Sequence, residues 1–223
     1  MNLPRRLTAE FLGTAFLLMT VIGSGIMGER LAQGNDAIAL LANSIATGCA
    51  LYALILIFGP VSGAHFNPAV TLCMALERRI LKIHAAAYTA VQVIAAFAGV
   101  ALAHLMFGEA LFTASVKIRT GSGQWLSECI ATFGLLTVIW GCVRQNIHAV
   151  PAAVACYITA AYWFTSSTSF ANPAVTLARS FSNSFAGIRP EDAAGFITAQ
   201  LAGAVAATLV ARYWADSSTG NQS

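Results

Sequence analysis

The chain has 223 residues, of which 57% are hydrophobic and only 9% carry a charge. Soluble domains carry about 25% charged residues, so a chain this apolar lacks the polar surface that a soluble protein shows to water. The net charge of +3 is small and scattered, which argues against nucleic-acid binding. The composition therefore predicts an integral membrane protein.

Six stretches are apolar over about the 20 residues that a membrane-spanning helix needs. The first follows Arg5 and Arg6, contains Glu10 and reaches spanning length, so we interpret it as an uncleaved helix rather than a signal peptide. The predicted spans are 7–27, 37–59, 83–105, 125–143, 149–166 and 193–214.

Two further segments are moderately apolar but too short to cross a membrane, and both contain the string NPAVTL, at 67–72 and 172–177. An identical string of this length indicates a duplication. The sequence therefore predicts one channel domain over 1–223. It consists of repeat one at about 7–105, a connecting loop at 106–124, and repeat two at about 125–214. Because each repeat holds three spans, the second repeat must insert upside down relative to the first.

Asn-Pro-Ala before an apolar run predicts the start of a helix, since Asn caps free backbone N–H groups and Pro is favoured at the first helical position. Two half-helices would enter from opposite faces and meet at the centre of the bilayer. Their converging dipoles would repel cations and protons. The side-chain amides of Asn67 and Asn172 would donate hydrogen bonds to neutral solutes. The predicted central constriction consists of Asn67, Pro68, Ala69, Asn172, Pro173 and Ala174.

The segments before the two motifs must be non-helical at membrane depth, which is tolerated where backbone is buried in protein or lines a wet cavity. Their carbonyl groups would form a ladder of acceptors along the pore. The residues expected to supply it are Gly63, Ala64, His65, Thr168 and Phe170. Glu10 and Glu128 are intramembrane carboxylates. We interpret them as supports that accept hydrogen bonds from these loops, with a proton relay as the alternative. His65 is interpreted as a brace for its loop, with a pH gate as the alternative.

The sequence resembles the aquaporin or major intrinsic protein family over nearly its whole length. The residues that carry the resemblance are AEFLGT at 9–14, SGAHFNPAV at 62–70, Gln92, Glu128, Asn172-Pro173-Ala174 and Gln200. The resemblance implies an all-α membrane protein. Six transmembrane helices and two re-entrant half-helices would form an inverted repeat, assembled as a homotetramer with one pore per subunit.

In most of this family an Arg follows the second Asn-Pro-Ala, and it forms part of the selectivity filter. Here that position is Val175. Counting from the two motifs places the other three filter positions at Thr47, Ala160 and Ser169. This set has no aromatic ring and no fixed cation, so it predicts a wider and less cationic filter. Two alternatives stay open, because Arg179 lies one turn beyond Val175 and could reach the outer mouth, and Phe170 could intrude.

The predicted function is passive permeation of water and of larger neutral solutes such as arsenous acid, boric acid, glycerol or urea. The missing filter Arg resembles the metalloid-permeable bacterial aquaglyceroporin-like branch. The alternatives are a narrow water-selective channel whose filter is refilled by Phe170 or Arg179, a non-conducting structural membrane protein, and a proton-coupled carrier.

No nucleophile–base arrangement or phosphate-binding loop is present, and the five cysteines lack metal-ligand spacing. We therefore expect no catalytic residues, no cofactor and no metal. Arg5 and Arg6 flank the first span, which predicts cytoplasmic termini. The expected location is the plasma membrane, as a bacterial inner-membrane protein. The expected partners are water, small neutral solutes, the lipid bilayer and further copies of the chain.

Overall fold

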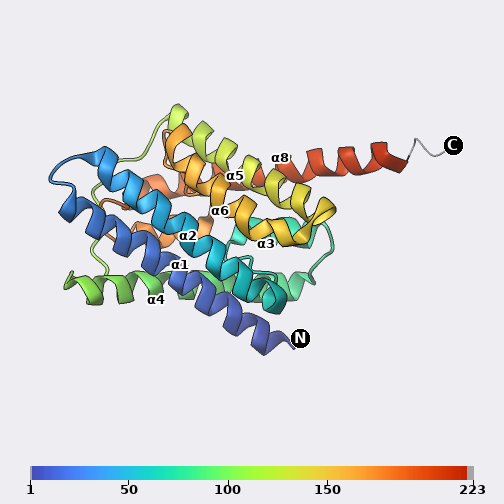
Figure 1. Cartoon of the computed structure of the whole chain (residues 1–223), viewed down its shortest axis with the longest axis horizontal. Helices are drawn as coiled ribbons and strands as arrows, with labels where there is room; N and C mark the ends of the chain where they lie inside the picture. Colours follow the sequence, from blue (N-terminus) through green and yellow to red (C-terminus); the bar gives the residue numbers. More distant parts are fainter. Residues whose placement is uncertain (1, 220–223) are drawn as a thin grey trace.

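A computed structural model describes residues 2–219 of the chain, and all the regular structure in that range is helical. Figure 1 shows the long helices lying roughly side by side, with the two shortest inside the bundle. The long helices are α1 (Leu3–Leu31), α2 (Asp36–Ser62), α4 (Lys82–Phe107), α5 (Ser122–Gln145), α6 (Val150–Phe164) and α8 (Pro190–Thr219). A single 3-10 turn, η1 (Ile147–Ala149), precedes α6, and the short helices are α3 (Pro68–Leu76) and α7 (Pro173–Arg179).

The six long helices are long and apolar enough to cross a membrane, and they contain the six predicted spans almost entirely. Five of them extend beyond the predicted limits by a few residues, whereas α6 lies within the predicted span 149–166. The capping residues explain several boundaries, because Asn2 and Asn35 accept hydrogen bonds from the first turns of α1 and α2. The prediction of an all-α membrane fold is therefore confirmed.

The helices pack in the same pattern in both halves of the chain. In the first half α1 contacts α2 and α4, and in the second half α5 contacts α6 and α8. The two halves meet through α2 and α6, while α3 and α7 touch each other and both contact α4 and α8. The short helices therefore fill the centre, where each is enclosed by elements of both halves.

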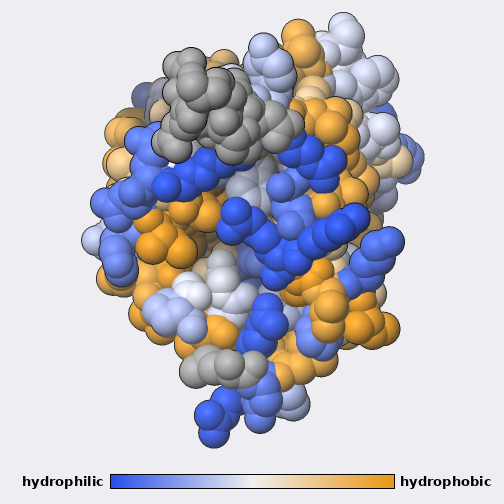
Figure 2. Space-filling model, turned by 90° about the vertical axis from the view of Figure 1, so that its right-hand side faces the viewer, coloured by the Kyte–Doolittle hydropathy of each residue, from blue (hydrophilic) through white to orange (hydrophobic). Residues whose placement is uncertain are grey.

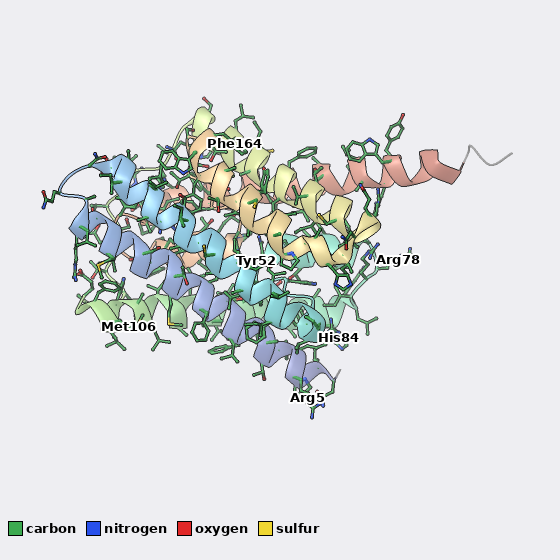
Figure 3. The ribbon with its side chains drawn as sticks, viewed as in Figure 1. Arg5, Tyr52, Arg78, His84, Met106 and Phe164 are labelled. Atoms are coloured by element: carbon green, nitrogen blue, oxygen red, sulfur yellow. The ribbon has the colours of Figure 1, made fainter. Side chains whose placement is uncertain are left out.

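The start of α1 and the end of α8 lie at the same end of the molecule, here called the terminal end (Figure 1). Arg5 and Arg78 project at this end, whereas Met106 and Phe164 lie toward the opposite end (Figure 3). A view onto the terminal end shows hydrophilic side chains gathered on the face and hydrophobic ones at its margin (Figure 2). The sides carry exposed apolar residues such as Ile57, Ile94 and Leu102, which suits contact with lipid.

A glycine in each half allows one helix to approach the backbone of another closely. A Cβ added at Gly99 on α4 would lie 2.3 Å from the carbonyl oxygen of Ala15 on α1, and one at Gly203 on α8 would lie 2.2 Å from that of Cys129 on α5. Lipid chains are as apolar as the helices, so association in a membrane depends on such close packing.

Replacing Gly99 with Ala is expected to force α1 and α4 apart and to lower the free energy of unfolding by about 1–3 kcal/mol. The measurement is thermal unfolding of the purified protein in detergent. Gly141→Ala on α5 is the control, because a Cβ there meets nothing within 4 Å. Equal stability of the two variants would contradict the packing described here.

Candidate functional site

A cavity of about 380 Å³ runs through the centre of the bundle, past both half-helices. Near the terminal end it is bordered by Val143 and His148, at mid-depth by Asn67 and Asn172, and farther on by Arg179. Most of the remaining wall is aliphatic. It includes Leu17, Val21, Leu51, Ile55, Leu135, Ile139, Val154 and Ile158. A few polar groups on an apolar wall are typical of a small-molecule site.

The two asparagines are joined crosswise at the centre. The Asn67 side-chain oxygen caps α3 by accepting from the N–H of Ala69, at 2.8 Å, and its Nδ2 donates to the Ala171 carbonyl, at 2.7 Å. Asn172 caps α7 in the same way, and its Nδ2 donates to the Phe66 carbonyl, at 2.8 Å. Each half-helix is thereby fixed to the loop that precedes the other. One N–H of each amide is used in this way, which leaves the second for a solute.

Only the asparagines of the two motifs border the cavity. The remaining residues of the predicted central constriction are buried beside it and start the half-helices. They are Pro68, Ala69, Pro173 and Ala174. The prediction that all six residues form the constriction is corrected accordingly, because these four side chains are buried in the protein and do not border the cavity.

The loops that lead into the motifs have unusual backbone conformations. In the first loop Ala64 and Phe66 have φ values of 48° and 47°, and in the second loop Ser169 and Ala171 have φ values of 51° and 48°. Left-handed backbone at non-glycine residues is strained, so other contacts must hold these loops. Non-helical backbone at this depth also needs partners for its polar groups.

Glu10, fully buried on α1, supplies the partners of the first loop. Its carboxylate accepts from the backbone N–H groups of His65 and Phe66, at 2.9 and 2.7 Å. It also accepts from the Ser62 hydroxyl, at 2.7 Å, and from Gln92 Nε2, at 2.8 Å. This is the contact pattern expected of a support for the loop.

Glu128, fully buried on α5, has the matching position in the second half. Its two oxygens accept from the N–H groups of Phe170 and Ala171, both at 2.9 Å. Gln200 Nε2 donates to it at 2.6 Å. Each carboxylate therefore holds two consecutive backbone N–H groups of its loop against the strain of the left-handed residues.

The predicted carbonyl ladder needs one correction. Gly63, Ala64, His65 and Phe170 border the cavity, whereas Thr168 does not and Ser169 takes its place. Thr168 turns instead toward Arg119, whose Nη1 donates to its hydroxyl at 3.4 Å. His65 also binds Thr71 through Nδ1, at 3.0 Å, and its ring packs on Tyr88, which suits the role of a brace.

Three of the four predicted filter residues border the cavity, namely Thr47, Ser169 and Val175. Ala160 does not, and it is exposed on the outer side of α6. This prediction was wrong because Ile158 and Tyr162, one turn apart, face inward, and a residue midway between them points about 200° away from either. Tyr162 lies where Ala160 was expected, with its hydroxyl 3.2 Å from that of Thr47.

The prediction of a filter without an aromatic ring or a fixed cation was also wrong. Tyr162, Phe170 and Arg179 all border the cavity near Val175. Arg179 is only 1% exposed. Its Nε donates to the Ala186 carbonyl, and its guanidinium carbon lies 3.3 Å from the centroid of the Phe170 ring.

Sequence reasoning missed Tyr162 and Arg119. The i, i+4 spacing of Ile158 and Tyr162 was available as a signal for the inner face of α6. Arg119 lies in the loop before α5, where no periodicity indicates its direction. It is 6% exposed, and it donates to the carbonyls of Ser167 and Gly187, at 3.0 and 2.8 Å. Burial lowers its pKa to about 10, so it remains a cation at neutral pH.

The sequence model of the family described as "Major intrinsic protein" matches residues 1–161 and 142–223, which together cover the chain. The chain belongs to this family. It is 56% identical to "Aquaglyceroporin AqpS" of Rhizobium meliloti (strain 1021) over 212 residues, which is 95% of this chain and 91% of that protein. It is 31% identical to "Nodulin-26" of Glycine max, over 64% of this chain and 52% of that protein.

Among solved structures, the aquaglyceroporin from Plasmodium falciparum superposes with a TM-score of 0.75. The match covers 96% of each chain at 20% identity, so it supports the fold alone. As a major intrinsic protein with six spanning helices, the chain is a multi-pass membrane protein and a passive channel, not an enzyme.

Replacing Glu128 with Gln should leave the N–H of Phe170 or of Ala171 without an acceptor, because an amide offers one oxygen where the carboxylate offers two. We expect a loss of about 1–3 kcal/mol in the free energy of unfolding and a lower water permeability in proteoliposomes. Glu109→Gln, at an exposed carboxylate, is the control. Unchanged permeability and stability in Glu128→Gln would refute the supporting role.

A pair of identical substitutions on α6 tests which side chains face the pore. Ile158→Phe should narrow the cavity and reduce water permeability severalfold, whereas Ala160→Phe should leave the permeability per channel unchanged. Stopped-flow light scattering on proteoliposomes with matched protein content measures both variants. The reverse order of effects would restore Ala160 as a pore residue.

Proposed function

We propose that this channel carries water and small neutral solutes such as glycerol through the central cavity. The observation that carries the proposal is the side chain of Val175, which borders the cavity directly after the second Asn-Pro-Ala. An Arg follows this motif in most of the family, and its absence leaves a short apolar side chain at that level. The 56% identity to a protein named an aquaglyceroporin supports the same conclusion.

A solute entering from the opposite end first meets Arg179 and the hydroxyls of Tyr162 and Thr47. These groups replace part of its hydration shell, as is general for selective pores. It then passes Val175 and reaches the free N–H of Asn67 and of Asn172. Beyond them the wall is largely aliphatic, with the loop residues Gly63, Ala64 and His65 as scattered polar contacts, so a neutral solute moves on without being held tightly.

The finer assignments belong to the same proposal. Neutral metalloid hydroxides such as arsenous or boric acid, and urea, have the size and hydrogen-bonding groups that suit this path. We further propose a homotetramer in a bacterial inner membrane, with both termini in the cytoplasm. The like packing of the first and second halves supports a single domain built from two inverted repeats.

A narrow water-selective channel is the second candidate, and a specific observation favours it. Phe170, Tyr162 and Arg179 border the cavity close to Val175, so they fill part of the space that a missing Arg would leave. The two candidates differ in the ratio of glycerol permeability to water permeability.

Val175→Arg should place a second guanidinium about one helical turn from Arg179 and close the filter to larger solutes. We expect glycerol and arsenous acid fluxes to fall about tenfold or more, with a smaller effect on water. Stopped-flow permeability in proteoliposomes, with each solute in turn, gives the comparison.

Val175→Leu is the matched control, because it adds volume without charge or donors, and it should retain most of the glycerol flux. If wild-type vesicles pass water but exclude glycerol, the water-selective candidate is correct. Equal glycerol fluxes in the wild type and in Val175→Arg would refute the role of Val175.

A further inference from the structure

Arg179 has the largest side chain among those that are almost fully buried. Among the side chains that the structure describes, those of residues 2–214, no carboxylate forms an ion pair with it. The groups that act on it electrostatically are Tyr162, Arg119 and Glu128. Of these only Glu128 is a carboxylate, and it is already held by two backbone N–H groups and Gln200. Burying a cation without a paired anion lowers the stability of the fold. A function that requires the positive charge would explain its presence at this position.

The position of Arg179 gives that charge direct access to the permeation path. It lies four residues beyond Val175 on α7, hence about 6 Å farther from the centre on the same helix face. Both side chains border the cavity. The Tyr162 hydroxyl, which also borders it, interacts with the guanidinium.

The guanidinium is held in this position from two sides. Its Nε donates to the Ala186 carbonyl, and the neighbouring Phe185 is fixed through its N–H by Glu29, at 3.0 Å, and through its carbonyl by Lys117, at 2.8 Å. Its plane rests on the Phe170 ring. That ring is in turn fixed by Phe196, with centroids 5.2 Å apart.

A second cation, Arg119, stands behind the same ring, at 5.1 Å from its centroid. Its donors are directed to the carbonyls of Ser167 and Gly187, and it does not border the cavity. We regard Arg119 as a positioning residue for the loop that carries Phe170. Arg179 alone presents its charge to the path.

We propose that Arg179 is the cation-excluding residue of this channel, and that the positive charge of the filter has moved one helical turn outward from position 175. The inference rests on the proposed function and names the residue that determines its specificity against ions. A single Arg at position 175 would both narrow the filter and repel cations, whereas here these two properties belong to different residues. At Val175 the α7 side chain stays apolar and leaves the path open to bulkier neutral solutes, while cations are repelled before they reach it.

The physical basis is the weak screening of a charge in a buried, largely apolar site. A cation approaching from the opposite end meets Arg179 while it is losing water. A neutral solute with oxygen atoms can instead accept a hydrogen bond from the guanidinium. The half-helix dipoles at the centre add a second barrier of the same sign, so removal of Arg179 should weaken ion exclusion without abolishing it.

The test uses the full chain in proteoliposomes that contain a pH-sensitive dye, under a potassium diffusion potential. Arg179→Met retains most of the side-chain length and removes the charge. We expect its proton conductance, taken relative to its own water permeability, to exceed that of the wild type by about tenfold or more. Arg30→Met, which removes an exposed cation at the same end, should show no increase.

Two further variants keep the test decisive. Arg179→Lys, which retains the charge, should exclude protons as the wild type does, and a leak as large as in Arg179→Met would overturn the proposal. Val175→Arg/Arg179→Met should restore exclusion by returning a cation to the path. Arg179→Gln replaces Arg179→Met if the latter fails to reconstitute. A proton leak in Arg179→Gln, with proton exclusion retained in Arg179→Lys, would then support the proposal.

An Arg179→Met variant that passes water normally and gains no proton conductance would overturn the proposal, because Arg179 would then serve packing alone. Failure of the proposed function is recognised separately, since it requires wild-type vesicles that do not pass glycerol. The proposal on Arg179 is judged from proton conductance in the variant vesicles, whereas the proposed function is judged from glycerol flux in the wild-type vesicles.

Discussion

The structure depends on the hydrogen bonds that hold two short non-helical loops at membrane depth. A loop in that environment has no water to satisfy its N–H groups, and here the carboxylates of Glu10 and Glu128 take that place. Once the loops are held, the half-helices can begin at mid-depth, and the crossed bonds of Asn67 and Asn172 tie them together. The cavity exists because the two loops before the half-helices stay non-helical beside it.

The filter shows how a channel can change one property without losing another. Val175 removes bulk and charge at the level where most of the family has an Arg, and Arg179 returns a charge one turn farther out. Tyr162 and Thr47 add hydroxyl groups at that outer level. In the proposed arrangement Val175 governs size selection and Arg179 governs charge selection, so the two properties can be altered independently.

The spans and the half-helix starts were predictable from the sequence, because apolar length and the Asn-Pro pair act locally. Glu10 and Glu128 were recognisable because a carboxylate inside a membrane span is costly and is usually functional. The filter was less predictable. Ala160 was placed by counting across a loop, and a displacement of two residues moved the inward face to Tyr162. Arg119 and Phe170 lie in two loops that are distant in the sequence and meet only in the fold. Local sequence patterns therefore could not predict their contact.

The central claim is a passive path that neutral solutes cross without being held. It is tested most directly by the concentration dependence of glycerol flux in wild-type proteoliposomes, measured without a proton or ion gradient. The structure predicts a flux that rises in proportion to glycerol concentration, since the largely aliphatic wall with a few scattered polar groups offers no site that binds glycerol tightly. A flux that saturates at low concentration, or that requires a pH gradient, would contradict a passive channel and indicate a carrier.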